Sequence, residues 1–186
     1  MPDAPERPRG YLGINRRPSR REWRRALIFF ASGMVALILL ALLVRPQANL
    51  LAVGTAAPAI SLDAAGGGHV DVATAAAGRS YILEFFEAGC AHCQEVAAQL
   101  CSEPIPVFAV DAAKDSPATV SSYRSLYAPR CTYPMLLDPN LSAGSSYNVN
   151  VVPTVYVIKQ GRIAYAGTGL DGVHGLAPAV ARAAGA

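Results

Sequence analysis

Cys90 and Cys93 are separated by only two residues in the segment ILEFFEAGCAHCQE (82–95), although the 186-residue chain contains just four cysteines. Thiols at this spacing can exchange disulfides, bind a soft metal ion or form a structural bridge. The pair follows the run YILEFF (81–86). Cys90 stands immediately before AHCQEVAAQLC (91–101), which contains Cys93, has good helix formers and lacks proline and glycine. The sequence therefore predicts that the pair lies where a strand gives way to a helix.

This position predicts different roles for the two thiols. At a helix N-terminus, free backbone N–H groups and the macrodipole favour the thiolate of Cys90, and a protonated His92 or the S–H of Cys93 would add to this effect. Cys93 lies one turn into the helix and is expected to be buried. A thiol there can attack a mixed disulfide at Cys90 and release the partner. We therefore predict disulfide exchange, with Cys90 as nucleophile and Cys93 as resolving thiol.

Three other uses of the pair remain open. A zinc site requires a second ligand pair, whereas Cys101 and Cys131 lie far apart in the sequence and no H-x-x-x-H motif follows. A copper-binding metallochaperone could use Cys90, Cys93 and a histidine, since thiolates are soft ligands. A purely structural C-x-x-C bridge is the third. Disulfide exchange is the interpretation we favour, and we expect no metal and no organic cofactor.

Glu84 stands in the middle of the apolar run, six residues before Cys90. Strand alternation turns its side chain inward together with that of Ile82, where burial raises the pKa of a carboxyl group. Such a carboxyl group can accept the proton of Cys93 and return it during exchange. The alternative is an exposed glutamate at the edge of a sheet.

The segment VVPTVYV (151–157) places a proline at the start of a strand-like run. A cis Val152–Pro153 peptide bond here would set a backbone edge beside the first cysteine, for pairing with an extended client segment. Val152, Thr154 and Gly89 are the predicted substrate contacts. The alternative is that the proline only ends a loop before the strand.

The rest of the chain predicts alternating strands and helices. Strands are expected at 59–62, 69–72, 81–86, 106–110, 134–138, 154–158 and 163–167, and helices at 91–101, 116–127, near 142–147 and at 176–184. This alternation, followed by a hairpin and a helix, favours an α/β domain over residues 57–186, with a mixed sheet flanked by helices.

Residues 26–44, ALIFFASGMVALILLALLV, contain no charge. As a helix they would extend roughly 28 Å, close to the ~30 Å hydrocarbon core of a bilayer. The basic segment before them predicts a single-pass signal anchor with a cytoplasmic tail (1–25), a linker (45–56) and an extracytoplasmic, periplasmic domain. The alternative is a cleaved secretory signal, although the apolar region of such signals is usually shorter, about 7–15 residues.

Charge is distributed unevenly along the chain. Residues 1–48 contain nine arginines and three acidic residues, a net charge of +6, whereas the remainder carries −3, which together give the +3 of the whole chain. The basic character therefore belongs to the N-terminal segment. The domain offers no basic face that would suit nucleic acid.

Residues 54–184 resemble the thioredoxin superfamily, and their layout is similar to its membrane-anchored TlpA/ResA-like branch. VGTAAPAISL (53–62) resembles the opening of that branch, and DPNLSAGSSYNVNVVPTVYVIKQGRIAYAGTG (138–169) resembles its closing stretch. The resemblance implies a thioredoxin-like fold, Cys90 as nucleophile, Cys93 as resolving thiol and Pro153 as the cis proline.

The active-site string LEFFEAGCAHC resembles that of DsbA, an oxidant, whereas the TlpA/ResA-like layout is usual in reductases. The resemblance leaves both directions open: a reductant, for instance in cytochrome c maturation, or a DsbA-like oxidant. Two positions depart from the relatives. Gly89 stands where many have a tryptophan, and Val96 stands where ResA-like proteins have a glutamate. The P-x-x-x-T-x-x-C pattern of peroxiredoxins does not occur.

Cys101 and Cys131 are predicted to form a structural disulfide, because an exported domain allows such a bond to persist. It would close a loop of thirty residues and stabilise the fold by roughly 3–4 kcal/mol. A second redox relay and two unpaired thiols are the alternatives. The expected partners are exported client proteins with reactive cysteines and a membrane redox partner that recycles the C-x-x-C pair.

Overall fold

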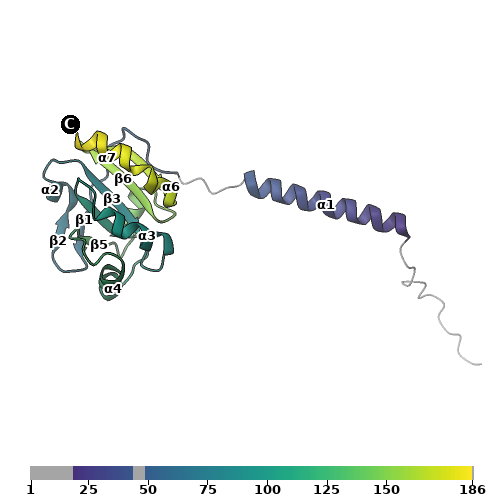
Figure 1. Cartoon of the computed structure of the whole chain (residues 1–186), viewed down its shortest axis with the longest axis horizontal. Coiled ribbons are helices and arrows are strands. Elements are labelled where there is room, and N and C mark those ends of the chain that lie inside the picture. The colour runs from purple at the N-terminus through teal and green to yellow at the C-terminus, as the bar shows by residue number, and fades with distance from the viewer. Residues whose placement is uncertain (1–18, 44–48, 186) are drawn as a thin grey trace, which may run out of the picture. The chain divides into compact units, whose positions relative to one another are not determined.

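The computed structural model describes residues 19–43 and 49–185 (Figure 1). The chain divides into two compact units, Met1–Gln47 and Ala48–Ala186. Residues 1–18, most of the predicted cytoplasmic tail, and 44–48, the last residue of the predicted span and the start of the predicted linker, lie outside the described residues.

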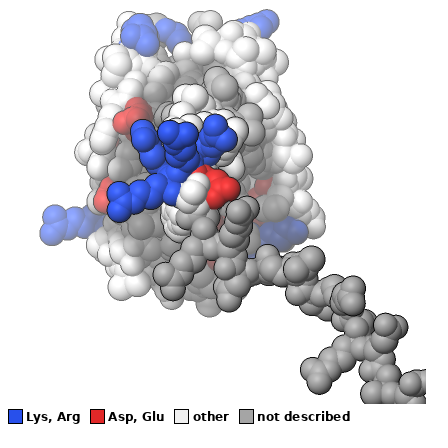
Figure 2. Space-filling model, turned by 90° about the vertical axis from the view of Figure 1, so that its right-hand side faces the viewer, with Lys and Arg blue, Asp and Glu red and all other residues white. Residues whose placement is uncertain are grey.

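The described part of the first unit is one helix, α1 (Arg20–Leu43). Ser19 and Glu22 form a capping box at its start: the Glu22 carboxylate accepts from Ser19 N at 2.6 Å, and the Ser19 hydroxyl accepts from Glu22 N at 3.3 Å. Figure 2 shows basic side chains gathered at this end of the helix. Farther along, its apolar side chains are exposed; Phe29 is 76% exposed and Leu37 is 70% exposed.

The predicted membrane span at 26–44 is not confirmed. Across residues 19–43 and 49–185, no helix has both the length and the hydropathy that a bilayer crossing requires. The last residue of the predicted span, Val44, lies outside this range.

The second unit is built on a mixed seven-stranded sheet, as predicted. Its spatial order is β2-β1-β5-β4-β3-β6-β7; β3, β4 and β5 are parallel, and every other pairing is antiparallel. The strands are β1 (Ser61–Ala64), β2 (His69–Asp71), β3 (Tyr81–Phe86), β4 (Val107–Asp111), β5 (Met135–Leu137), β6 (Thr154–Lys159) and β7 (Arg162–Thr168). The interior strand β3 is buried at every residue, which explains why the apolar residues of YILEFF lie on both of its faces rather than alternating with polar ones.

Helices cover both faces of the sheet. They are α2 (Val72–Ala76), α3 (Ala91–Leu100), α4 (Pro117–Tyr127), α5 (Ser142–Ser146), α6 (Gly169–His174) and α7 (Leu176–Ala184). One apolar cluster joins α3, α4, α6 and α7 to the face of β3 that carries Ile82 and Phe86. A second joins α2 and α5 to the face that carries Leu83 and Phe85. The sheet is therefore the middle layer of three.

Local sequence explains most of these boundaries. Ser116 caps α4 by accepting from Thr119 N, and Pro117 occupies the first turn, where its missing N–H costs nothing. The β6–β7 hairpin turns at Gln160 and Gly161, which both have positive φ values, +51° and +70°. Such a two-residue turn matches the twist of the flanking strands.

Two short helices, α2 and α6, were not predicted. The six residues of α6, GLDGVH, include two glycines, which disfavour a helix locally. The structure shows why glycine is needed there: a Cβ on Gly167 of β7 would lie 2.7 Å from Gly172 Cα. The helix exists because it packs closely on the sheet, and such packing leaves no local pattern.

Candidate active site

Cys90 is the N-cap residue of α3, at the end of the loop that leaves β3. Its Sγ accepts a hydrogen bond from the backbone N–H of Cys93 at 3.2 Å. Residues Ala91 and His92 make up the exposed first turn. Cys90 itself is partly exposed, and both thiols are free in this structure. The predicted strand-to-helix junction is thus confirmed, and a backbone N–H of the helix points at the sulfur that would carry the negative charge.

Cys93 is fully buried, at 0% exposed, on the face of α3 that packs against β3. Burial raises the pKa of its thiol above the ordinary range, and the side-chain hydrogen bond with Cys90 raises it further. The backbone carbonyl of Cys93 accepts a hydrogen bond from the buried Tyr123 hydroxyl at 2.7 Å. Cys93 is therefore held in place as a protonated thiol and needs a proton acceptor before it can attack.

The Val152–Pro153 peptide bond is cis, as predicted. This loop brings the carbonyl oxygen of Val152 to 3.8 Å from Cys90 Sγ, within reach of the thiol. Two bonds fix the loop: Thr154 Oγ1 donates to Val151 O at 2.6 Å, and Gly169 N donates to the carbonyl of Pro153. The backbone edge beside the nucleophile is therefore rigidly positioned.

The predicted substrate contacts differ in where their side chains lie. Val152 is half-buried at the loop, and Gly89 is exposed immediately before Cys90. Thr154 is 0% exposed, and its hydroxyl is used inside the loop, so its side chain positions the loop rather than facing a client. A Cβ on Gly89 would meet only the Glu87 carboxylate, at 3.6 Å, so a side chain fits there.

Glu84 is buried in the centre of β3, at 1% exposed, which excludes the alternative of a sheet-edge glutamate. It pairs with Ala109 of β4 and Val155 of β6, two small or apolar neighbours. Its Oε1 is buried without a hydrogen-bond partner among the described residues. Burial raises the pKa of Glu84 to about 8. When Glu84 is ionised, its negative charge also raises the pKa of the Cys93 thiol. The protonation states of the two groups therefore influence each other.

Two aspartates, one at the end of β4 and one in the loop that follows, brace the active-site loop, and sequence reasoning missed both. Asp115 Oδ2 accepts from Ala88 N at 2.9 Å, two residues before Cys90. Asp111, fully buried, holds that turn by accepting from Asp115 N at 2.8 Å and from Ala113 N at 3.1 Å. Burial raises the pKa of Asp111 to about 6. The sequence feature that could have indicated them is Asp111, an acidic residue at the carboxyl end of a strand expected to lie parallel to β3.

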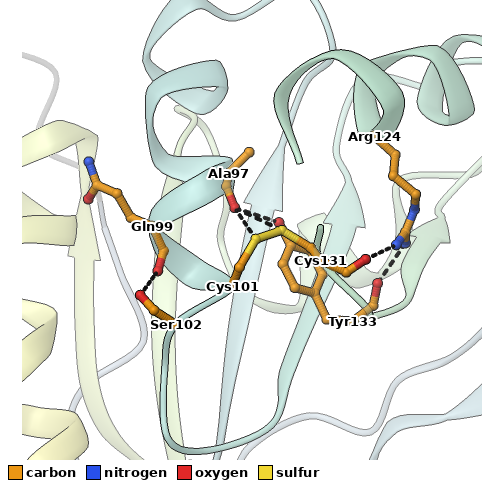
Figure 3. Close-up of a disulfide and its surroundings, with 7 residues drawn as sticks. All are labelled: Ala97, Gln99, Cys101, Ser102, Arg124, Cys131 and Tyr133. Carbon is orange, nitrogen blue, oxygen red and sulfur yellow. Dashed lines mark hydrogen bonds between the residues drawn. A yellow bond between two sulfur atoms is a disulfide. The ribbon is translucent and has the colours of Figure 1, made fainter. Parts of the chain in front are cut away.

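The disulfide between Cys101 and Cys131, predicted from the sequence, is present in the structure (Figure 3). It joins the C-terminal end of α3 to the loop before β5. Both sulfurs lie 3.6 Å from the carbonyl oxygen of Ala97, which accepts a hydrogen bond from the Tyr133 hydroxyl at 3.0 Å. The bond therefore fixes the end of α3 opposite to the C-x-x-C pair.

The copper alternative would need Cys90, Cys93 and a histidine close together. Within residues 19–43 and 49–185, no group of three or more His, Cys, Asp or Glu side chains could hold a metal ion. His92 lies between the two cysteines in the sequence and is exposed on the first turn of α3. It does not form a three-ligand group with them. A third ligand for a site at Cys90 and Cys93 is thus not assembled in this part of the chain.

Comparison with known proteins agrees with the fold. The profile of the Redoxin family matches residues 52–183, so the chain belongs to the Redoxin family. No curated protein sequence matches it. A putative protein disulfide isomerase from Bacteroides thetaiotaomicron has a similar structure, with 15% identity and a TM-score of 0.63, over 73% of this chain and 92% of that one.

Two further structures are similar. A putative Thiol:disulfide interchange protein DsbE from Chlorobium tepidum has 19% identity and a TM-score of 0.61, over 72% of this chain and 98% of that one. A secreted Mycobacterium tuberculosis disulfide oxidoreductase homologous to E. coli DsbE has 17% identity and a TM-score of 0.56, over 66% of this chain and 95% of that one. At these identities the likeness concerns the fold. Family, fold and cysteine pair together define a thioredoxin-like thiol–disulfide oxidoreductase.

Proposed function

We propose that the protein is an extracytoplasmic thiol–disulfide oxidoreductase that exchanges the Cys90–Cys93 disulfide with cysteines of exported client proteins. The observation that carries this proposal is the position of Cys90 Sγ. It lies 3.2 Å from the N–H of Cys93 and 3.8 Å from the carbonyl of Val152, the residue before the cis proline. An extended client segment pairing with that backbone edge would bring its own sulfur to the nucleophile.

In the reducing direction, the Cys90 thiolate attacks one sulfur of a client disulfide, and the other client sulfur leaves as a thiolate. Glu84 then takes the proton of Cys93, whose thiolate attacks Cys90 Sγ. That step breaks the mixed disulfide, releases the second client sulfur and leaves Cys90 and Cys93 oxidised. A membrane partner must return two electrons before the next cycle. Run backwards, the same steps oxidise a client dithiol.

A trapping experiment tests this proposal in the full chain. In Cys93→Ser the second attack cannot occur, so a mixed disulfide with a client should accumulate and disappear on adding dithiothreitol. In Cys90→Ser the nucleophile is missing, so none should form, although the buried Cys93 remains. Equal adduct formation by the two variants would contradict the assignment of Cys90 as nucleophile.

The location is part of the same proposal. The Cys101–Cys131 disulfide supports an oxidising compartment. The exposed apolar side chains of α1, with arginines before them, support a single-pass anchor that keeps the N-terminus in the cytoplasm. Protease added to intact spheroplasts should degrade the second unit, and alkaline carbonate should leave the chain in the membrane fraction. Release of the chain by carbonate would remove the anchor from the proposal.

The direction of exchange can be decided by the reduction potential of the pair. A value near −120 mV, as in DsbA, would assign the donation of disulfides to clients, whereas a value near −270 mV, as in thioredoxin, would assign reduction, for instance of apocytochrome c. Glutathione buffers with alkylation of Cys90 and Cys93 give this value directly.

A further inference from the structure

The two sulfurs of the Cys101–Cys131 disulfide have different surroundings. Cys101, the C-cap residue of α3, is exposed, whereas Cys131 is 8% exposed. A cavity of about 550 Å³ is lined by Cys101 together with apolar side chains that include Leu100, Ile105 and Tyr133. Cys131 does not line this cavity. Cys101 is therefore the half of the disulfide that a molecule in the cavity can reach, and Cys131 packs in the core.

This asymmetry suits attack by an incoming thiolate. A thiolate must reach one sulfur while the other leaves, and only Cys101 is on the cavity wall. The Arg124 guanidinium donates to the carbonyl oxygens of Cys131 at 3.0 Å and of Tyr133 at 2.6 Å (Figure 3). A positive charge is thus held against the backbone of Cys131.

The charges around the cavity indicate which kind of thiol it would admit. Arg79 and Arg130, both exposed, line the cavity, and Glu103 is its acidic residue. The two arginines outnumber this one glutamate. The wall is therefore positive on balance and would attract a small anion.

We propose that Cys101–Cys131 is a second thiol-exchange site, which reacts with a small anionic thiol of the glutathione class held in this cavity. The thiolate attacks Cys101 Sγ, the Cys101–Cys131 bond breaks, and Cys131 leaves as a thiolate that takes a proton from solvent. A second molecule of the thiol attacks the mixed disulfide, which frees Cys101 and yields the oxidised form of the thiol. The thiol supplies both electrons. This site goes beyond exchange with proteins at Cys90 and does not depend on it.

A thiol series tests the proposal on the full chain carrying Cys90→Ser and Cys93→Ser, so that only one disulfide can react. The oxidised protein is mixed with reduced glutathione (anionic), 2-mercaptoethanol (neutral) or cysteamine (cationic), each at the same thiolate concentration. Acid quenching, alkylation and mass spectrometry then count free Cys101 and Cys131. At low salt we expect glutathione to react about tenfold faster than cysteamine, and we expect this ratio to shrink in 0.5 M salt.

Substitutions locate the charge that causes the preference. Arg79→Gln and Arg130→Gln should each lower the glutathione rate about threefold and leave the 2-mercaptoethanol rate unchanged. Arg182→Gln, an exposed arginine on α7 that does not line the cavity, is the matched control and should change neither. Equal rates for the three thiols, or reduction only in denaturant, would overturn the proposal. Exchange at Cys90 would be unaffected by that outcome, because it is measured separately by client trapping.

Discussion

Replacing Glu84 by glutamine should remove a pH dependence of stability that the structure assigns to this one carboxyl group. Its pKa rises from 4.5 to about 8 because it is buried. Below about pH 4.5 the group is protonated in both states and has no effect. Between pH 4.5 and 8 the unfolded chain releases the proton and the folded chain keeps it, so the free energy of unfolding falls as pH rises. Above pH 8 the full cost is present.

The size of the effect follows from the same shift. One pKa unit corresponds to about 1.36 kcal/mol, so Glu84 should lower the free energy of unfolding by on the order of 4 kcal/mol between pH 5 and 8. Asp111, whose pKa rises to about 6, makes the free energy of unfolding depend on pH only below about pH 6, and its cost is constant above that, so the range from pH 6 to 8 isolates the slope due to Glu84. Glu84→Gln has no charge to gain and should lose this slope. At pH 5 it should cost about 1–3 kcal/mol, because the buried amide lacks partners.

Urea unfolding of the oxidised protein at several pH values measures this dependence, since the thiols of Cys90 and Cys93 do not titrate in the disulfide. Glu95→Gln, an exposed position on α3, is the matched control and should keep the slope of the wild type. If Glu84→Gln and the wild type have the same slope between pH 6 and 8, Glu84 does not titrate there. At pH 9, where Glu84 is ionised in the folded protein, the same variant should slow release of the mixed disulfide by about 100-fold, as expected when a proton acceptor is lost.

Three further outcomes follow from hydrogen bonds and the second disulfide. Replacing Cys101 and Cys131 together by alanine should lower the free energy of unfolding by about 3–4 kcal/mol, because it frees a loop with a sequence separation of 30; urea titration against the oxidised wild type measures this loss. Tyr123→Phe removes the buried hydroxyl that donates to the carbonyl of Cys93 and should cost about 1 kcal/mol by the same titration, and unchanged stability would contradict the bond. Thr154→Ala frees the loop before the cis proline, so client exchange should slow several-fold while the reduction potential of the pair stays the same; a changed potential would show that the hydroxyl acts on the thiols instead.

Several parts of the fold followed from short-range patterns. YILEFF is apolar except at Glu84 because β3 is buried on both faces, and AHCQEVAAQL forms α3 because it is rich in good helix formers and lacks proline and glycine. Ser116 with Pro117 marked the start of α4, and the Gln160–Gly161 turn marked the β6–β7 hairpin. In these segments, local preference and tertiary packing agree, so the sequence was sufficient.

Other features depend on contacts between distant segments. Helix α6 forms around the close approach of Gly167 and Gly172, although its own sequence disfavours a helix. The brace from Asp115 to Ala88 crosses 27 residues, so it depends on a contact between two segments that are distant in the sequence.

The sequence by itself determined the chemistry: a C-x-x-C pair at a helix N-terminus, an inward-facing glutamate and a proline before a strand are all properties of short segments. Tertiary structure alone decided how these parts meet. It set Cys90 Sγ 3.8 Å from the carbonyl of Val152, which lies 62 residues away in the chain, and it left Glu84 Oε1 without a partner among the described residues. The physical reason is that burial and long-range hydrogen bonding are properties of the packed sheet and its helices, and these interactions adjust the thiols and the carboxyl group that the sequence supplies.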